Sequence, residues 1–193
     1  MPRTRMFVIC LAMALLAVGS AWAQANPAYA DTFKVDYFAN ANTAGAPDAT
    51  VRLDNPGTAG GSLCADIFVF DTAEELSECC SCSLSPDDLR TLSVNTDLTS
   101  NPGNGVTVTA GVIKIVASST AGCPLPTSSK NVTPTPSIRG WGTHIQNSNF
   151  TITETATQDA GLSNRELGSL EAQCFSINKV DSGHGICTCG QGE

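Results

Sequence analysis

Apolar and polar residues alternate in several short segments of this chain, and a period of two is typical of half-buried β-strands. In residues 49–54, Val51 and Leu53 are apolar while their neighbours on either side are polar or small. Residues 63–70 are almost continuously apolar, which favours a central strand. Because a turn sequence that begins with Asn55-Pro56-Gly57 lies between the two segments, we predict that they form a hairpin.

Weaker versions of the same pattern predict further strands. Gly- and Pro-rich turns separate these segments, and a long loop rich in Ser, Thr and Pro covers residues 118–136. The additional segments with a strand pattern are residues 32–38, 89–94, 106–108, 112–117, 138–146 and 150–155.

Two capping patterns predict helices. Asp71 followed three residues later by Glu74 is typical of a helix N-terminus, and it predicts a short helix over residues 72–80. Ser163-Asn164-Arg165-Glu166 is a capping box that predicts a helix ending near Phe175. One face of that second helix carries Leu167, Leu170 and Cys174.

The composition agrees with a β-rich fold. Hydrophobic residues make up 41% of the chain and charged residues 15%, so Thr and Ser supply most of the polar surface, and Thr favours strands. We predict a mainly β protein: a disulfide-stapled β-sandwich or barrel with short helical insertions and one C-terminal helix. Its length suits one domain, residues 24–193, with residues 24–31 loose at its start.

Residues 1–23 have the three parts of a secretory signal peptide. Arg3 and Arg5 form a positive start, residues 6–18 are apolar and uncharged, and Ala21-Trp22-Ala23 is a small-residue cleavage site of bacterial appearance. The apolar run is shorter than the roughly 20 residues needed to span a bilayer. We therefore expect a protein that is secreted or held at the cell surface, with no membrane span in the mature chain.

Removal of the two signal-peptide arginines leaves eight basic residues against 18 acidic ones, a net charge of −10. Such a chain repels nucleic-acid phosphates and anionic lipids, so we expect no nucleic-acid partner.

Eight cysteines follow the cleavage site. In an oxidising compartment an even number predicts four disulfides, although spacing alone does not determine the pairing. The two clusters at residues 79–82 and 187–189 are suited to bridging each other, and a thiolate metal site is the alternative. The cysteines are Cys64, Cys79, Cys80, Cys82, Cys123, Cys174, Cys187 and Cys189.

No motif specifies a reaction, and we assign no catalytic, cofactor-binding or metal-binding residue. In a hydrolase, Ser182 would be the nucleophile, His184 the base and Asp181 the group that orients the base. Residues this close in sequence rarely converge in space, and a Gly-rich loop is the simpler interpretation. Trp141 and His144 are further surface candidates, because an exposed indole stacks on sugar rings; packing in the core is the alternative for Trp141.

Several segments of the chain resemble a family of exported, cysteine-rich hypothetical proteins of environmental bacteria with no assigned function. The resemblance implies export and a shared scaffold, and it implies no site residues. It rests on residues 51–56, 63–71, 78–82, 89–95, 111–116 and 183–190.

Export, Ser/Thr-rich strands and the lack of a catalytic motif favour a non-catalytic extracellular or surface module with a structural, adhesive or binding role. A surface, a matrix or a carbohydrate is the partner we expect. A secreted hydrolase or hydrolase inhibitor, and a metal-binding protein built on the cysteine clusters, are the alternatives.

Overall fold

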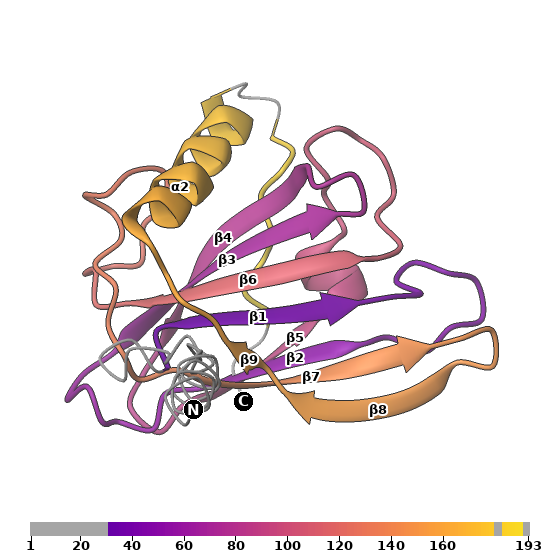
Figure 1. Ribbon diagram of the computed structural model, residues 1–193, viewed down its shortest axis with the longest axis horizontal. Coiled ribbons are helices and arrows are strands. Elements are labelled where there is room, and N and C mark those ends of the chain that lie inside the picture. The colour runs from indigo at the N-terminus through magenta and orange to yellow at the C-terminus, as the bar shows by residue number, and fades with distance from the viewer. Residues whose placement is uncertain (1–30, 180–182, 191–193) are drawn as a thin grey trace, which may run out of the picture.

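The computed structural model describes residues 31–179 and 183–190 (Figure 1). The expected signal peptide and residues 24–30 lie outside the described residues. The helical elements are the short π-helix η2 (Val94–Leu98) and the α-helix α2 (Asn164–Lys179). The strands are β1 (Phe33–Phe38), β2 (Thr50–Asp54), β3 (Leu63–Asp71), β4 (Leu76–Leu84), β5 (Leu89–Ser93), β6 (Gly111–Ser118), β7 (Arg139–Gln146), β8 (Thr151–Ala156) and β9 (Gln158–Asp159).

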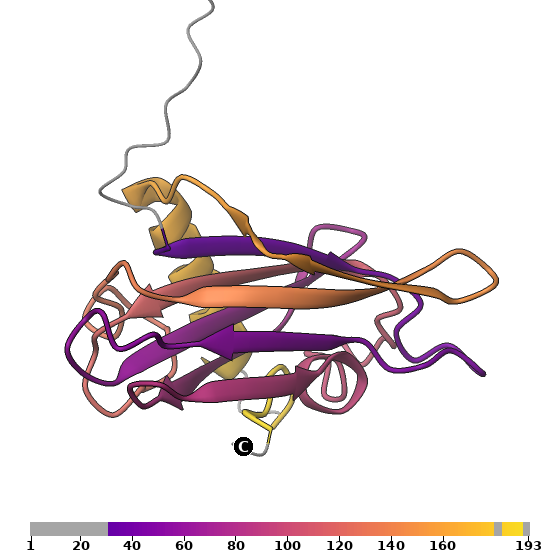
Figure 2. The same ribbon diagram turned by 90° about the horizontal axis from the view of Figure 1, so that it is seen from below.

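The strands form two antiparallel sheets that stack as a sandwich (Figure 2). Sheet A has the order β4-β3-β6-β1-β9, and sheet B has the order β5-β2-β7-β8. The sheets do not close into a barrel, so the sandwich alternative of the predicted fold class is the correct one. Helix α2 lies against the outer face of sheet A, which makes three layers: sheet B, sheet A and α2 (Figure 1).

The core has two parts because sheet A is covered on both faces. The larger cluster fills the space between the sheets and includes Val51, Leu53 and Ile67. The smaller cluster lies between sheet A and α2 and includes Phe68 and Leu170. The continuous apolar run of β3 follows from this arrangement, since its odd-numbered and even-numbered side chains face different apolar layers.

The predicted hairpin between residues 49–54 and 63–70 is wrong, although both segments are strands. β2 pairs with β5 and β7 in sheet B, whereas β3 pairs with β4 and β6 in sheet A. The turn between them crosses from one sheet to the other. Buried Asn55 holds this crossing, because its amide donates to the carbonyl oxygens of Gly61 and Leu84, both at 3.0 Å.

The predicted helix over residues 72–80 is also wrong, because most of this segment belongs to strand β4. The Asp71 carboxylate accepts from the backbone N–H groups of Ala73 and Glu75, so it caps a tight turn in which Glu74 has a φ of 64°. β3 and β4 therefore form the hairpin. Residues 106–108 form no strand either. By contrast, Ser163 caps α2 as predicted, and this helix extends to Lys179.

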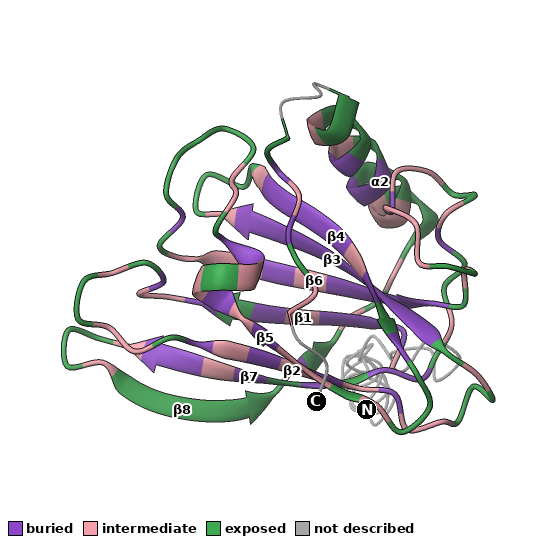
Figure 3. Ribbon diagram, turned by 180° about the vertical axis from the view of Figure 1, so that it is seen from behind, coloured by how far each residue is buried: buried purple, intermediate pink, exposed green. Residues whose placement is uncertain are grey.

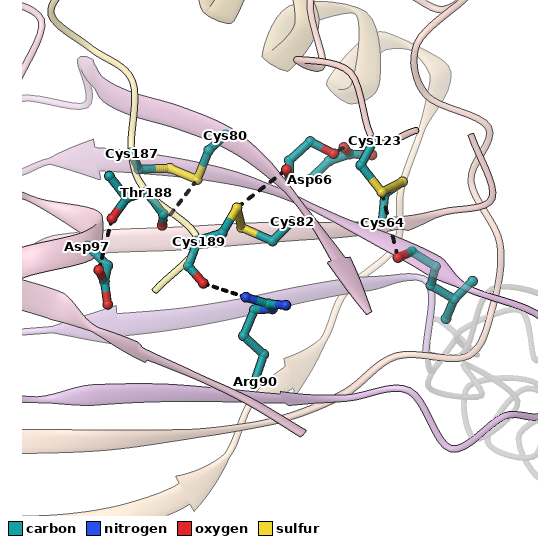
Figure 4. Close-up of a disulfide and its surroundings, with 12 residues drawn as sticks. Cys64, Asp66, Cys80, Cys82, Arg90, Asp97, Cys123, Cys187, Thr188 and Cys189 are labelled. Carbon is teal, nitrogen blue, oxygen red and sulfur yellow. Dashed lines mark hydrogen bonds between the residues drawn. A yellow bond between two sulfur atoms is a disulfide. The ribbon is translucent and has the colours of Figure 1, made fainter. Parts of the chain in front are cut away.

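The two sides of the sandwich are closed by different means. On the β4/β5 side, the C-terminal tail, residues 183–190, runs along β4: the Cys79 N–H donates to the Gly185 carbonyl oxygen at 2.9 Å. Disulfides Cys80–Cys187 and Cys82–Cys189 fix the tail there (Figure 4). Arg90 of β5 donates to the Cys189 carbonyl oxygen at 2.8 Å, which ties the tail to sheet B as well.

On the opposite side, the chain itself passes from one sheet to the other. β8 pairs with β7 in sheet B, and β9, which follows at once, pairs with β1 in sheet A. The residue at the crossing, Thr157, is buried, and its N–H donates to the Gly140 carbonyl oxygen at 3.0 Å. Hydrogen bonds and chain continuity close this side.

Candidate functional site

The eight cysteines that follow the expected cleavage site are paired in four disulfides. Alternation along β4 sends Cys79 to the α2 side and Cys80 to the space between the sheets, so these neighbours have different partners. The two tail bridges confirm that the cysteine clusters join each other. The pairs are Cys64–Cys123, Cys79–Cys174, Cys80–Cys187 and Cys82–Cys189.

Disulfide formation removes the thiolates that a metal site would need. Within residues 31–179 and 183–190, no group of three or more His, Cys, Asp and Glu side chains is placed to hold a metal ion. Four disulfides are typical of an oxidising compartment outside the cytoplasm. In the same described ranges, no helix combines the length and the apolar character needed to span a bilayer.

The outer face of sheet B, which we call the open face, is not covered by another helix or strand of the described residues. Its side chains alternate with buried ones such as Leu53 and Leu92, which point inward. The cross-strand register aligns one row over all four strands: Thr91, Arg52, Trp141 and Ala156. The remaining members of the open face are Leu89, Ser93, Thr50, Asp54, Arg139, Thr143, Ile152 and Glu154.

Trp141 lies near the middle of this face with 36% of its surface exposed. Its neighbour on β8 is Ala156, whose side chain is small. On the other side stands Arg52 of β2. An aromatic ring held on a rigid strand loses little conformational entropy on binding, which makes it a good anchor for a ligand.

Arg52 and Glu154 form an ion pair across β7, between Trp141 and Thr143. Nη1 of Arg52 lies 2.8 Å from Oε1 and 3.0 Å from Oε2 of Glu154, and both side chains are about two-fifths exposed. An exposed pair of this kind contributes at most about 1 kcal/mol to stability. Its fixed guanidinium and carboxylate offer hydrogen-bond donors and acceptors beside the indole without a net charge.

The structure separates Trp141 from His144. The two residues are three positions apart on β7, so they point to opposite faces, and His144 is buried between the sheets. The candidate surface therefore keeps Trp141 and loses His144.

His144 has a structural environment rather than a catalytic one. Its Nδ1 donates to the Tyr37 carbonyl oxygen at 2.9 Å, and its Nε2 lies 2.8 Å from Oγ1 of Thr155. The Asp36 carboxylate approaches the same Nε2 at 3.5 Å. In a hydrolase triad the acid and the hydroxyl contact different nitrogens of the imidazole. Here they share one nitrogen, and the group links β1 to β7 inside the sandwich.

Burial raises the pKa of Asp36, against the opposing effects of the Tyr37 N–H and the His144 ring. Gly142 of β7 lies next to this carboxylate, and a Cβ at this position would collide with it. The glycine in β7 thus makes room for the buried pair.

His184 lies in the tail, where its Nδ1 is 2.7 Å from Oδ1 of Asn101. The other two members of the hypothetical triad, Asp181 and Ser182, lie outside the described residues. Asn101 also donates to the Gly183 carbonyl oxygen at 2.9 Å. The described contacts of His184 are those of a residue that fastens the tail.

Besides Asp36, three more buried carboxyl groups among the described residues were missed by the sequence analysis. Burial raises the pKa of Asp66 to about 6 and that of Glu78 to about 7, and it also raises the pKa of Glu171. Asp66 accepts from Ser81 Oγ at 2.6 Å and faces Glu171 of α2, whereas Glu78 accepts from the Asn101 N–H at 2.7 Å. An acid within the apolar run of β3 was the available signal for Asp66.

Two shallow hollows lie along α2, away from the open face. One, of about 440 Å³, is lined by the β3–β4 turn and by α2 residues such as Gln173 and Ile177. The other, of about 290 Å³, contains the ion pair between Lys114 and Glu166.

Comparisons of the chain with protein-family models, with curated proteins and with solved structures find no match. The family resemblance therefore remains a prediction.

Proposed function

We propose that this chain is an exported, non-catalytic binding module, secreted or held at the cell surface, that recognises carbohydrate through its open face. The single observation that carries the proposal is the exposed indole of Trp141, which stands among charged and hydroxyl side chains on the open face. The signal-peptide pattern of residues 1–23 and the four disulfides support a location outside the cytoplasm.

The chemistry of the open face suits a neutral, hydroxylated ring. The flat, C–H-rich side of a pyranose packs on an indole, while its hydroxyl groups need donors and acceptors at the margin. The Arg52–Glu154 pair and the nearby Thr50 and Thr143 hydroxyls, which lie 3.0 Å apart, supply both kinds of group. An anionic polymer is disfavoured by the net charge of the protein.

The shape of the face favours a chain over a single sugar. Neither of the two hollows along α2 includes Trp141, and an open surface binds by repeated contacts along an extended ligand. A polysaccharide that crosses the strands would contact Trp141 and the Arg52–Glu154 pair at once.

Native gel electrophoresis in the presence of soluble β-glucan, xylan or mannan tests this function. A chain beginning at Gln24 has Trp141 as its only tryptophan, so indole fluorescence reports on the same face in solution. We expect one of these polysaccharides to retard the protein and to shift its emission, with at least a tenfold loss of affinity in Trp141→Ala.

Phe175→Ala is the matched control, because Phe175 is an exposed aromatic residue on α2, far from the open face. This variant should bind like the wild type. The proposal fails if none of the three polysaccharides retards the wild type, or if Trp141→Ala binds as tightly as the wild type.

A further inference from the structure

β8 differs from the other strands that border the two sheets. All six of its residues are exposed, including Ile152 at 59%, and Glu154 is the one charged residue among them (Figure 3). The β7–β8 hairpin also extends beyond the body of the sandwich (Figure 2). Within residues 31–179 and 183–190, β8 pairs with β7 and with no other strand.

The other borders are protected. The tail pairs with β4 through backbone hydrogen bonds of Cys79 and holds β5 through Arg90. β9 is two residues long and leads toward α2. Natural proteins blunt exposed edges with charges, proline or covering segments, because an open edge is a template for another strand. A long unprotected strand in a protein that guards its other edges indicates a surface with a partner.

We propose that β8 is a self-association edge, at which a second copy of this chain adds its own β8 antiparallel and joins the two sheets B into one. A two-fold axis perpendicular to the sheet generates this arrangement. Such an axis keeps the open faces of both copies on the same side, and residues directly opposite each other then have the same orientation.

The sequence of β8 favours one register. In this register the axis passes midway between Thr153 and Thr153 of the second copy. Thr151 then lies opposite Thr155 of the second copy, so three threonine pairs follow one another along the contact. On the open face, Ile152 then lies beside Glu154 of the second copy. Thr–Thr pairs are favourable across strands.

The neighbouring registers are worse. An axis through Glu154 would place two carboxylates directly opposite each other, which is destabilising. An axis through Ile152 would pair fewer residues of the strand. The contact is one strand wide, so the association is weak and depends on concentration.

A consequence is that the dimer presents two Trp141 side chains in one direction. Two weak sites on one rigid sheet bind a repeating ligand more tightly than either site alone. The proposal on β8 does not require the ligand to be carbohydrate, since its test reads mass rather than binding.

Sedimentation velocity on the mature protein, from about 10 μM to about 1 mM, tests the proposal, because weak contacts form in this range. We expect the average mass to rise toward that of a dimer. Thr153→Glu and Thr153→Lys each place like charges opposite each other at the axis, so each variant alone should stay monomeric. Their equimolar mixture should dimerise again, because the charges are then opposite.

Thr91→Glu on β5, the strand at the other border of sheet B, is the matched control and should dimerise like the wild type. Circular dichroism establishes that every variant is folded. A wild type that is monomeric throughout, a dimer that survives Thr153→Glu, or folded variants that fail to associate when mixed would each overturn the proposal.

Discussion

The two sides of this sandwich solve the same problem with different chemistry. On the β4/β5 side, a short Gly-rich tail with two disulfides joins the two sheets. On the other side the chain passes directly from β8 to β9, and buried polar groups such as His144 link β7 to β1.

The difference teaches which contacts need covalent support. Thr157 is positioned by its neighbours in the chain, so its hydrogen bond forms at little entropic cost. The tail is more than 100 residues away from its partner strand, since Cys80 and Cys187 are separated by 107 positions. Closing such a loop is costly for the unfolded chain, and a disulfide removes that cost from folding.

The largest effect should come from breaking the covalent side. A variant with Ala in place of Cys80, Cys187, Cys82 and Cys189 loses two disulfides that close long loops, each worth about 2–4 kcal/mol. We expect its free energy of unfolding in urea to fall by at least about 4 kcal/mol. The control lacks the Cys64–Cys123 disulfide, whose separation is 59 residues, and should lose less. If both variants lost the same free energy of unfolding, the two tail disulfides would not be what holds this side of the sandwich together.

A smaller effect should follow from weakening the hydrogen-bonded side. His144→Ala leaves a cavity between the sheets and removes the group that faces the buried Asp36 carboxylate. We expect a loss of about 2–4 kcal/mol in the free energy of unfolding. Thr143→Ala, on the same strand but on the open face, should change it by less than about 1 kcal/mol. Equal free energies of unfolding for the two variants would refute the structural role of His144.

The smallest effect concerns Asp66 and Glu171, the acids between sheet A and α2, where Cys79–Cys174 holds α2 against β4. The pKa of Asp66 is raised from 3.8 to about 6, so the stability associated with its protonated form is present below the lower value and is lost as the pH rises through the higher one. Glu78 and Glu171 shift in the same direction.

Unfolding should therefore be harder at about pH 4 than at about pH 8, with about 2–3 kcal/mol attributable to Asp66. Asp66→Asn removes that ionisation, so the difference in the free energy of unfolding between the two pH values should be smaller by this amount. The melting temperature should accordingly vary less with pH in the variant than in the wild type. Parallel pH profiles for the wild type and the variant would contradict the buried position of the carboxyl group.

Local patterns were sufficient for most strands and for α2, but not for their pairing. Val51 and Leu53 indicate which side of β2 is buried, and Ser163 indicates where α2 begins. The loop that takes the chain from β2 to the other sheet is held by the side chain of Asn55, which donates to the carbonyl oxygen of Leu84, a residue of another strand. Such a long-range contact has no local signature.

The helix predicted over residues 72–80 failed for a related reason. Asp71 caps a turn as readily as a helix, and the outcome is decided by the disulfides and the strand pairing of the following cysteines. The sequence did not predict the composition of the open face either. Arg52, Trp141 and Glu154 lie on three strands, and they meet only because β7 inserts between β2 and β8. Trp141 alone was identifiable as a candidate.

The most direct test of the covalent closure is a disulfide map of the protein, obtained by proteolysis without reduction and electron-transfer fragmentation of the linked peptides. The structure predicts that the peptide containing Cys79, Cys80 and Cys82 is linked both to α2 through Cys174 and to the tail through Cys187 and Cys189. A bridge within the tail between Cys187 and Cys189, or free thiols at these positions, would contradict the account.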